Sequence, residues 1–436
     1  MSAVPKLKPQ PLLTGCPAAA LRGDVQVPGD KSISHRALIL GGLATGETRI
    51  RGLLEGDDVL NTARAVRALG ASVERVGPGE WRIGGARWRS PDGPIDCGNS
   101  GTGARLLMGA VAGHSIEAQF VGDASLSRRP MERVLGPLRE MGAKAEGVRL
   151  PVTIRGGQLG GIRYLNDKAS AQVKSAILLA GLRTDADVEV IEPRPSRDHT
   201  ENLLRGFGCD VEIDGRSIRL GQKRSLSAID IDVPGDPSSA AFFIVAALIV
   251  PGSQIRLRNV MTNPLRTGLF QTLTEMGGKL SFENRRKIGA EEVADIVVSS
   301  ADLRGVEVPA DRAPTMIDEY PILAIAAACA TGPSVMHGLA ELRVKESDRL
   351  AAIVAGLKAC GIEAHDDGDT LVVEGCGGPP PGGAPVVAED DHRIAMSFLV
   401  MGLASRRPVS VDSVDMIATS FPAFPELMGS IGAAIA

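Results

Sequence analysis

The chain has 436 residues and a formal net charge of −4, with 44% hydrophobic but only 3% aromatic residues. The overall field of an acidic chain does not attract nucleic acid or an anionic membrane, which argues against both classes of general binder. Any cation cluster must therefore be local. A chain of this length exceeds what one hydrophobic core usually supports, so we expect two domains of about 200 residues each.

The cysteines and the apolar runs indicate a cytoplasmic protein. The six cysteines contain no C-x-x-C pair, which favours free thiols in a reducing compartment. The proline-rich and lysine-containing first 17 residues enclose no apolar core, so we expect no signal peptide. The longest apolar run, residues 240–250, has 11 residues and is too short to span a bilayer.

Two helical patterns alternate along the chain with strand-like segments, such as WRIGG and TLVVEG, between them. The first pattern is apolar on nearly all sides and is therefore expected to be buried. The second is amphipathic and ends on a glycine, which suits the left-handed position that stops a helix. The first pattern begins at Lys31, Asn99, Ser170, Pro237, Asp318 and Asp391, and the terminal glycines are Gly70, Gly142, Gly208, Gly277, Gly361 and Gly432.

These glycines are 66 to 84 residues apart, so six α/β units of roughly 70 residues tile the chain. A coincidental alternation of helices and strands is the alternative. It is disfavoured because the buried pattern and the glycine terminator recur together.

Charged, hydroxyl-bearing and Gly-rich segments gather at the starts of the predicted buried helices, where free N–H groups favour anions. Lys31, Ser32 and Arg36 could hold a phosphate or carboxylate, although a capping serine beside two solvated cations would show the same pattern. The segment GNSGTGAR, residues 98–105, lets backbone N–H groups approach a ligand, although a tight turn with an N-cap is the alternative. It matches neither a Walker loop nor the dinucleotide fingerprint, so ATP and NAD sites lose support.

Charged residues also precede the amphipathic helices, at residues 128–130, 196–200 and 343–349. In the last segment we expect Lys345 and Arg349 to share one helix face, although a solvated charge cluster is the default for such a run. The pairs starting at Asp318 and Asp390 open the fifth and sixth buried helices, where carboxylates ordinarily act as caps.

Because these segments occupy equivalent positions of a repeat, we expect the fold to bring them to a common surface. Such a cleft suits ligands with several negative charges, and two carboxylates inside it could perform acid–base chemistry. The cations expected to face it are Lys31, Arg36, Arg105, Arg129, Lys174, Lys345, Arg349 and Arg393.

Seven segments, in order, make the chain resemble the 5-enolpyruvylshikimate-3-phosphate synthase family over nearly its whole length: PGDKSISHRA, GNSGTGAR, GDASLSRRP, SAQ, GDPSSAAF, RVKESDRL and DHRIAM. MIDEYPILA and IATSFP resemble the branch that diverges from the plant and enterobacterial type. The resemblance implies an α/β fold: a two-domain inverse α/β barrel built from six repeated α/β units, three per domain. It assigns residues 1–28 plus 236–436 to the first domain and 29–235 to the second, with crossings near Gly29 and Gly235.

The resemblance also implies an enzyme. Members of this family transfer the enolpyruvyl group of phosphoenolpyruvate to the 5-hydroxyl of shikimate 3-phosphate and release phosphate, a step of the shikimate pathway toward chorismate and the aromatic amino acids. They need no metal or organic cofactor and are the target of glyphosate. We therefore expect a cytoplasmic monomer that binds these two small molecules and neither nucleic acid nor membrane.

Carried over position by position, the resemblance assigns roles to individual residues. Asp318 would be the general base for the 5-hydroxyl, and Glu346 the acid that protonates the phosphoenolpyruvate methylene to give a tetrahedral ketal phosphate. Clustered cations would keep Asp318 ionised, whereas crowding would leave Glu346 partly protonated. Shikimate 3-phosphate would contact Lys31, Ser32, Arg36, Ser170, Gln172, Ser196, Asp318 and Lys345, and phosphoenolpyruvate would contact Lys31, Gly101, Arg129, Gln172, Arg349 and Arg393.

Two positions depart from the family pattern. Thr419 stands where many members have a lysine before [ST]-F-P, and Ala171 stands where others have a second serine. Neither departure removes the acid–base pair. Gly101 leaves room that a side chain would fill, so we expect sensitivity to glyphosate.

Three other functions compete. A UDP-N-acetylglucosamine enolpyruvyl transferase shares the fold and the donor, but normally has Lys-Asn at the position of Lys31-Ser32 and uses a loop cysteine as its acid. A six-repeat clamp around DNA would need basic residues along exposed helix faces, whereas the cations here stand at helix starts. A catalytically inactive protein that binds a phosphorylated metabolite would carry the same motifs.

Overall fold

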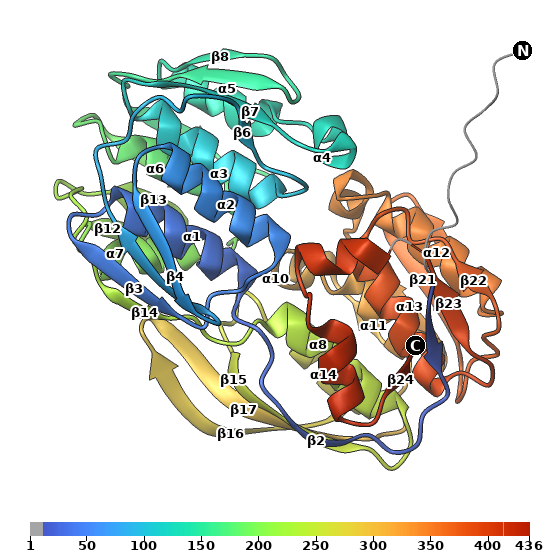
Figure 1. Ribbon diagram of the computed structural model, residues 1–436. Helices are drawn as coiled ribbons and strands as arrows, with labels where there is room; N and C mark the ends of the chain where they lie inside the picture. Colours follow the sequence, from blue (N-terminus) through green and yellow to red (C-terminus); the bar gives the residue numbers. More distant parts are fainter. Residues whose placement is uncertain (1–11, 413) are drawn as a thin grey trace, which may run out of the picture.

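The chain folds into two bodies of mixed α/β structure. A computed structural model describes residues 12–412 and 414–436. The buried hydrophobic residues form two clusters, one from residues 21–27 and 240–433 and the other from residues 33–233 with Met261. Figure 1 shows the corresponding lobes, with the first strands of the chain lying among the strands of the C-terminal half.

The six predicted buried helices are confirmed. Each is buried along most of its length, because its apolar residues surround the helix axis and leave no polar face for water. The first two begin directly after side chains that cap them, Asp30 bonding the N–H of Ile33 and Ser100 that of Gly103. These helices are α1 (Lys31–Leu43), α3 (Gly101–Ala112), α6 (Ala171–Gly181), α8 (Pro237–Ile249), α11 (Tyr320–Cys329) and α13 (His392–Ala404).

The six amphipathic helices are confirmed as well. All six predicted terminal glycines adopt φ values between 79° and 112°, in the left-handed region where a side chain would be strained. The helices are α2 (Asp57–Ala68), α5 (Glu132–Glu140), α7 (His199–Gly206), α9 (Gly268–Glu275), α12 (Arg349–Ala359) and α14 (Phe424–Ser430). The shorter helical segments are α4 (Ala124–Arg128), α10 (Ala313–Met316), η1 (Ala310–Arg312), η2 (Ala340–Val344) and η3 (Val414–Thr419).

One predicted helix start is wrong. The segment 343–349 was expected to be helical, but η2 ends at Val344 and α12 begins only at Arg349. Asp348 takes the N-cap position and accepts the N–H of Ala351. Lys345 and Arg349 therefore do not share a helix face, because residues 345–348 lie outside the helix that Asp348 caps.

The strands of the described residues form six four-stranded sheets, each with one parallel and two antiparallel pairings. The sheets are β14-β3-β5-β4, β6-β7-β9-β8, β10-β11-β13-β12, β2-β15-β17-β16, β18-β19-β21-β20 and β22-β23-β1-β24. Their bounds are β1 (Leu13–Cys16), β2 (Arg22–Val25), β3 (Glu47–Arg51), β4 (Ser72–Gly77), β5 (Glu80–Gly84), β6 (Ile95–Asp96), β7 (Glu117–Val121), β8 (Lys144–Glu146), β9 (Val152–Arg155), β10 (Ile162–Leu165), β11 (Val188–Ile191), β12 (Val211–Asp214), β13 (Ser217–Leu220), β14 (Asp230–Asp232), β15 (Gln254–Met261), β16 (Lys279–Ile288), β17 (Glu291–Ser299), β18 (Glu307–Val308), β19 (Thr331–Met336), β20 (Ala364–Asp367), β21 (Thr370–Cys376), β22 (Pro385–Val386), β23 (Val409–Val411) and β24 (Ala434–Ile435).

The chain passes between the two bodies at two glycines that pair with each other, Gly29 and Gly235. A Cβ on Gly29 would lie 1.9 Å from the carbonyl oxygen of Gly52, so the close approach requires glycine there. The two connections thus lie side by side at the starts of α1 and α8, which brings the starts of helices from both bodies together. In the part of the chain that the structure describes, no helix is long and apolar enough to cross a membrane.

Candidate functional site

A cleft of about 220 Å³ lies between the two bodies, walled by the starts of the buried helices and by the loops beside them. Its wall contains eleven lysines and arginines but five carboxylates, an excess of six positive charges. The cations are Lys31, Arg105, Arg129, Arg133, Lys168, Arg194, Arg197, Arg266, Lys345, Arg349 and Arg393, and the carboxylates are Asp58, Asp236, Asp318, Glu341 and Glu346. The cleft is therefore suited to ligands that carry several negative charges.

Six of the eight cations predicted to face the cleft do so, and the prediction is wrong for Arg36 and Lys174. The Arg36 guanidinium is buried and donates to Thr200 Oγ1 and Ser175 Oγ, both at 2.7 Å. The Lys174 ammonium is buried within α6 beside two glutamates. Both side chains are held behind the wall by these partners, Arg36 by Thr200 and Ser175 and Lys174 by Glu192 and Glu201.

Asp318 is held by three cations. Its Oδ1 lies 3.1 Å from Lys345 Nζ and 3.2 Å from Arg349 Nη1, and its Oδ2 lies 2.6 Å from Arg197 Nη2. Burial alone would raise the pKa of Asp318, but Lys345, Arg197 and the neighbouring arginines hold that pKa well below its usual value. The expectation that Asp318 is ionised is confirmed.

Glu346 lies between two guanidinium groups. Its Oε2 is 2.6 Å from Arg349 Nη2, and its Oε1 is 3.4 Å from Arg129 Nη1. Although burial raises the pKa of Glu346, these arginines outweigh it and hold the pKa well below the usual range. The expectation that crowding leaves Glu346 partly protonated is therefore wrong for the protein's own charges, because its nearest neighbours are cations and not carboxylates.

Arg349 joins the two carboxylates. Its side chain is 1% exposed and also bonds Asp391, with Nε 2.7 Å from Oδ2. Burial would lower the pKa of Arg349, but Asp391, Glu346 and Asp318 together raise it. This guanidinium stays charged and fixes the two carboxylates on either side of it.

The glycine-rich start of α3 faces Arg129 and Arg105. A Cβ on Gly101 would lie 2.8 Å from Arg105 Nη1 and 3.2 Å from Arg129 Nη1, so any side chain there would press on both guanidinium groups. Arg129 Nη2 is fixed on Asn99 Oδ1 at 2.6 Å. The amide of Gln172 bridges this region to α6, since its oxygen accepts from Arg105 Nη1 at 2.8 Å.

The remaining assigned residues also reach the cleft, with one exception. Lys31, Ser32, Ser170, Gln172, Ser196 and Arg393 line its wall, as does Ala171. Arg36 does not line it but donates to the backbone oxygen of Ser32 at 2.9 Å. Thr419, which stands at the family's lysine position, is turned to the backbone oxygen of Met416 at 2.7 Å.

Sequence analysis missed several residues of the wall. Arg197 lay in a motif that was noted, but its partner Asp318 is 121 residues away and only the fold brings them together. Asp58 Oδ2 accepts from Lys31 Nζ at 2.9 Å, and nothing in its segment signals this. His392 lines the cleft with its Nε2 unpartnered among the described atoms.

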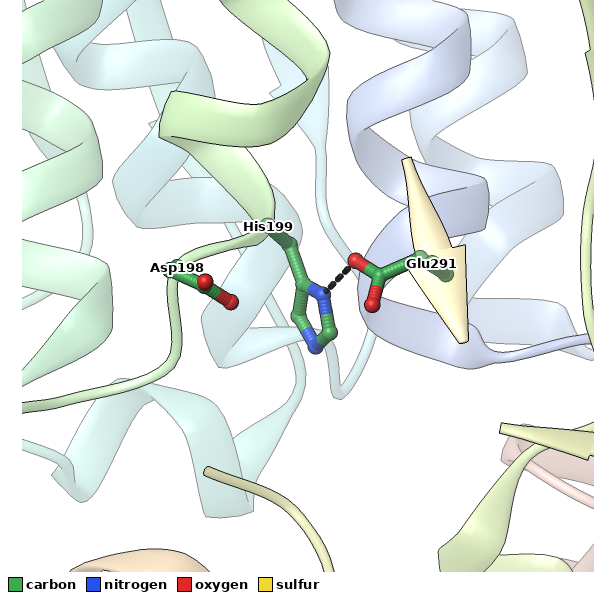
Figure 2. Close-up of side chains that lie close together, drawn as sticks. All are labelled: Asp198, His199 and Glu291. Atoms are coloured by element: carbon green, nitrogen blue, oxygen red, sulfur yellow. Dashed lines mark hydrogen bonds and ion pairs between the residues drawn. The ribbon is translucent and has the colours of Figure 1, made fainter. Parts of the chain in front are cut away.

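Figure 2 shows a three-residue group, Asp198, His199 and Glu291, whose ligand-type atoms lie within 4.8 Å of one another. His199 Nδ1 lies 2.8 Å from Glu291 Oε1, and its Nε2 lies 3.5 Å from Arg266 Nη1. A guanidinium so close to the second ring nitrogen opposes a metal ion at this place. The group instead links α7 to β17, one from each body.

The sequence and the fold match one family. The model of the family described as EPSP synthase (3-phosphoshikimate 1-carboxyvinyltransferase) matches residues 16–428. A relative from Caulobacter vibrioides, named 3-phosphoshikimate 1-carboxyvinyltransferase, is 55% identical over 97% of this chain and 98% of its own length. One of the same name from Acidiphilium cryptum is 57% identical over 96% of each chain.

Two solved structures are similar in fold. The EPSP synthase from Acinetobacter baumannii has a TM-score of 0.87 and 45% identity, covering 98% of this chain and 99% of its own. The enolpyruvyl transferase NikO from Streptomyces tendae has a TM-score of 0.76 over 98% of both chains, at 21% identity, and supports the fold alone. From the family match and these identities together, the chain belongs to the EPSP synthase (3-phosphoshikimate 1-carboxyvinyltransferase) family.

Proposed function

We propose that the chain transfers the enolpyruvyl group of phosphoenolpyruvate to the 5-hydroxyl of shikimate 3-phosphate and releases phosphate. Membership of the family supports this reaction. The observation that carries it is the pairing of Asp318 and Glu346 on one buried guanidinium, Arg349, inside a cleft with an excess of positive charge. Both substrates are polyanions, and such a cleft concentrates them.

Asp318 is the general base of the proposed reaction. Its carboxylate is ionised and takes the proton of the 5-hydroxyl as that oxygen forms a bond to C2 of phosphoenolpyruvate. Lys345 and Arg197 hold this carboxylate from two sides, which fixes its direction. The proton that C3 of phosphoenolpyruvate gains comes from Glu346, and the product is a tetrahedral ketal phosphate.

The protonation of Glu346 depends on the substrates. Arg129 and Arg349 depress its pKa, and the phosphate and carboxylate of phosphoenolpyruvate would neutralise these same arginines. The pKa of Glu346 then rises as the donor binds, which makes the acid available in the complex. In the second step the C2–O bond to phosphate breaks and the proton on C3 returns to Glu346.

The substrate contacts follow the cleft wall. Shikimate 3-phosphate contacts Lys31, Ser32, Ser170, Gln172, Asp318 and Lys345, and phosphoenolpyruvate contacts Lys31, Gly101, Arg129, Gln172, Arg349 and Arg393. Arg36 acts through the backbone of Ser32. Ser196 lines the same wall.

The finer architecture is part of this proposal. The six sheets, each with a buried and an amphipathic helix, are six repeated units that form a two-domain inverse α/β barrel with three units per domain. The two hydrophobic clusters support domains of residues 1–28 plus 236–436 and 29–235, although residues 1–11 lie outside the described part of the chain. The enzyme would act as a monomer in the cytoplasm and bind neither nucleic acid nor membrane.

Glyphosate competes with phosphoenolpyruvate, and the space beside Gly101 is where a side chain would crowd Arg105 and Arg129. Because Gly101 has no side chain to press on these guanidinium groups, we expect inhibition constants well below the millimolar range. Values in the millimolar range would contradict this expectation.

The test of the function is direct. Purified protein is mixed with shikimate 3-phosphate and phosphoenolpyruvate, and phosphate release is followed. The matched control replaces shikimate 3-phosphate with UDP-N-acetylglucosamine, which should give no release. Absence of release with shikimate 3-phosphate at micromolar enzyme would refute the proposal.

A further inference from the structure

A buried ion cluster lies behind the cleft wall, where Lys174 contacts two glutamates. Lys174 Nζ lies 2.9 Å from Glu192 Oε2 and 2.7 Å from Glu201 Oε1, and the three side chains are 1%, 3% and 1% exposed. A buried ion cluster costs desolvation energy that apolar residues of similar volume would not. Its presence therefore suggests a role other than stability.

Glu192, which directly follows strand β11, accepts four donors. Lys174 Nζ and the backbone N–H of Ser196 donate to Oε2, the latter at 3.1 Å. Ser196 Oγ and Asn166 Nδ2 donate to Oε1, at 2.6 and 2.7 Å. Ser196 has only these two donors, and both are engaged by Glu192, so in this arrangement it has no proton to offer an anion.

Asn166 extends the cluster to the start of α6. Its Nδ2 also donates to the backbone oxygen of Ser170 at 3.1 Å, and its Oδ1 accepts the N–H of Ser170 at 3.2 Å. These bonds hold a turn in which Ala169 has φ 49°, a left-handed conformation that costs a non-glycine residue about 1 kcal/mol. Glu192 therefore fixes two separate loops, one through Ser196 and one through Asn166.

Both loops end in the cleft. The first carries Arg197, which bonds Asp318, and the second carries Ser170. In the described part of the chain, the hydrogen bond recorded for Ser170 Oγ is one it accepts, from the N–H of Val173 at 3.5 Å. The hydroxyl proton of Ser170, unlike that of Ser196, is thus free to bind a phosphate oxygen.

We propose that Glu192, Lys174 and Asn166 form a positioning unit that sets Ser170 for the phosphate-bearing end of shikimate 3-phosphate and Arg197 for its bond with Asp318. Ser196 belongs to this unit, since Glu192 holds both of its donors. Lys174 lies between Glu192 and Glu201 and offsets part of their negative charge, which would otherwise repel the substrate. The proposal rests on the proposed function, since it concerns one substrate of that reaction.

The test is Glu192→Gln. An amide keeps one acceptor oxygen, and its NH₂ group cannot accept, so either Ser196 or Asn166 loses its partner. We expect the KM for shikimate 3-phosphate to rise roughly 10- to 100-fold. We expect the KM for phosphoenolpyruvate to stay within about threefold, because the donor half of the cleft is untouched. We expect kcat to fall by less than the KM for shikimate 3-phosphate rises, because Arg197 is one of three cations that hold Asp318.

Glu189→Gln is the matched control. Glu189 lies on β11, three residues before Glu192, and bonds Ser217 and Arg219 instead. It should leave both KM values unchanged. Combining Glu192→Gln with Ser196→Ala adds a second criterion: if Glu192 acts through Ser196, the double variant should lose much less than the product of the two single losses.

An equal rise in both KM values, a fall in kcat alone, or unchanged kinetics in a folded variant would overturn the proposal. If Glu192→Gln does not fold, Glu192→Asp keeps the charge beside Lys174 while drawing the carboxylate back, and the same outcomes decide. Calorimetric binding of shikimate 3-phosphate to wild type and variant needs no turnover. It therefore separates failure of this proposal from failure of the proposed function, which would appear as a wild type that releases no phosphate.

Discussion

Two groups of buried charges lie between the bodies of this protein, and they differ in balance. The crossing cluster, formed by Asp30, His199, Asp236, Arg266 and Glu291, stands where the chain passes from one body to the other. Arg266 lies 2.9 Å from Asp30 and 3.2 Å from Asp236, the caps of α1 and α8. The cleft beside it shares Arg266 and Asp236 with this cluster, and its other charges are ten cations against four carboxylates.

The difference indicates where each region finds its counter-charges. In the crossing cluster the protein supplies both signs, and each carboxylate has a partner within the protein that helps to hold the two bodies together. In the cleft the protein supplies an excess of one sign, and polyanionic ligands would supply the other. Both regions lie at helix starts of the same repeating pattern. The balance of positive and negative side chains is therefore what distinguishes the structural group from the binding site.

Removing the carboxylate of Asp318 or of Glu346 should have the largest effect on turnover. Asp318→Asn loses the base and Glu346→Gln loses the acid, and each should lower turnover by about 10²- to 10⁴-fold. Phosphate release measures turnover, and circular dichroism checks the fold. Glu341→Gln, at a partly exposed ion pair with Arg133, is the control and should have a far smaller effect. Turnover within tenfold of wild type for Asp318→Asn would remove Asp318 from the role of base.

The crossing cluster should respond in stability instead. Arg266→Met leaves Asp30 and Asp236 buried without their cation, which should cost about 3–5 kcal/mol of unfolding free energy. The matched cleft change is Lys345→Met, where Asp318 keeps Arg197 and Arg349. It should cost less than about 1 kcal/mol, because Lys345 is partly exposed, and should raise the KM for shikimate 3-phosphate. Denaturant unfolding measures the unfolding free energy of both variants. Equal losses of free energy would mean that the crossing cluster and the cleft do not differ in their contribution to stability.

The sequence predicted the scaffold well because its signals are local. A helix that is apolar all round and a glycine that ends a helix each depend on neighbours within a few residues, and all twelve of these helices formed. The crossing cluster could not be found this way, since Arg266 and Asp30 are 236 residues apart. The glutamates behind the wall were missed for the same reason.

Whether a site residue could be predicted also depends on how local its signal is. Those at the first turn of a helix, such as Lys31 and Gly101, reach the cleft as predicted. Arg36 and Lys174 are buried behind the wall, whereas Arg105, which also stands one turn inside its helix, reaches the cleft; a motif does not state which way such a residue will point. The charge state of Glu346 was mistaken because a sequence shows that acids cluster, but not that Glu346 lies between two guanidinium groups.

The pH dependence of stability should reflect the cleft. Because the folded pKa of Glu346 is depressed, its ionised form stabilises the folded protein above the ordinary glutamate value of about 4.3, and this contribution is lost as the pH falls through the folded value. Glu346→Gln should therefore lose less unfolding free energy than wild type as the pH falls from about 4.3 toward the folded pKa. Burial raises the pKa of Asp236, so Asp236→Asn should act in the opposite sense. Denaturant unfolding at a series of acidic pH values gives the slope of unfolding free energy against pH for wild type and for each variant. Equal slopes would contradict these directions of the two pKa shifts.

Salt should produce the smallest effect and still separate the two regions. Lys168 and Arg194 are exposed at the cleft edge, and screening shortens the reach of such charges from about 10 Å at 0.1 M to about 3 Å at 1 M ionic strength. We expect the KM of both substrates to rise a few-fold over that range, and less so in a Lys168→Ala, Arg194→Ala double variant. The crossing cluster is buried and screened far less, so the unfolding temperature should hardly follow the same trend. If the KM values do not change with salt, the excess positive charge of the cleft does not attract the substrates from a distance, and its cations act only after contact.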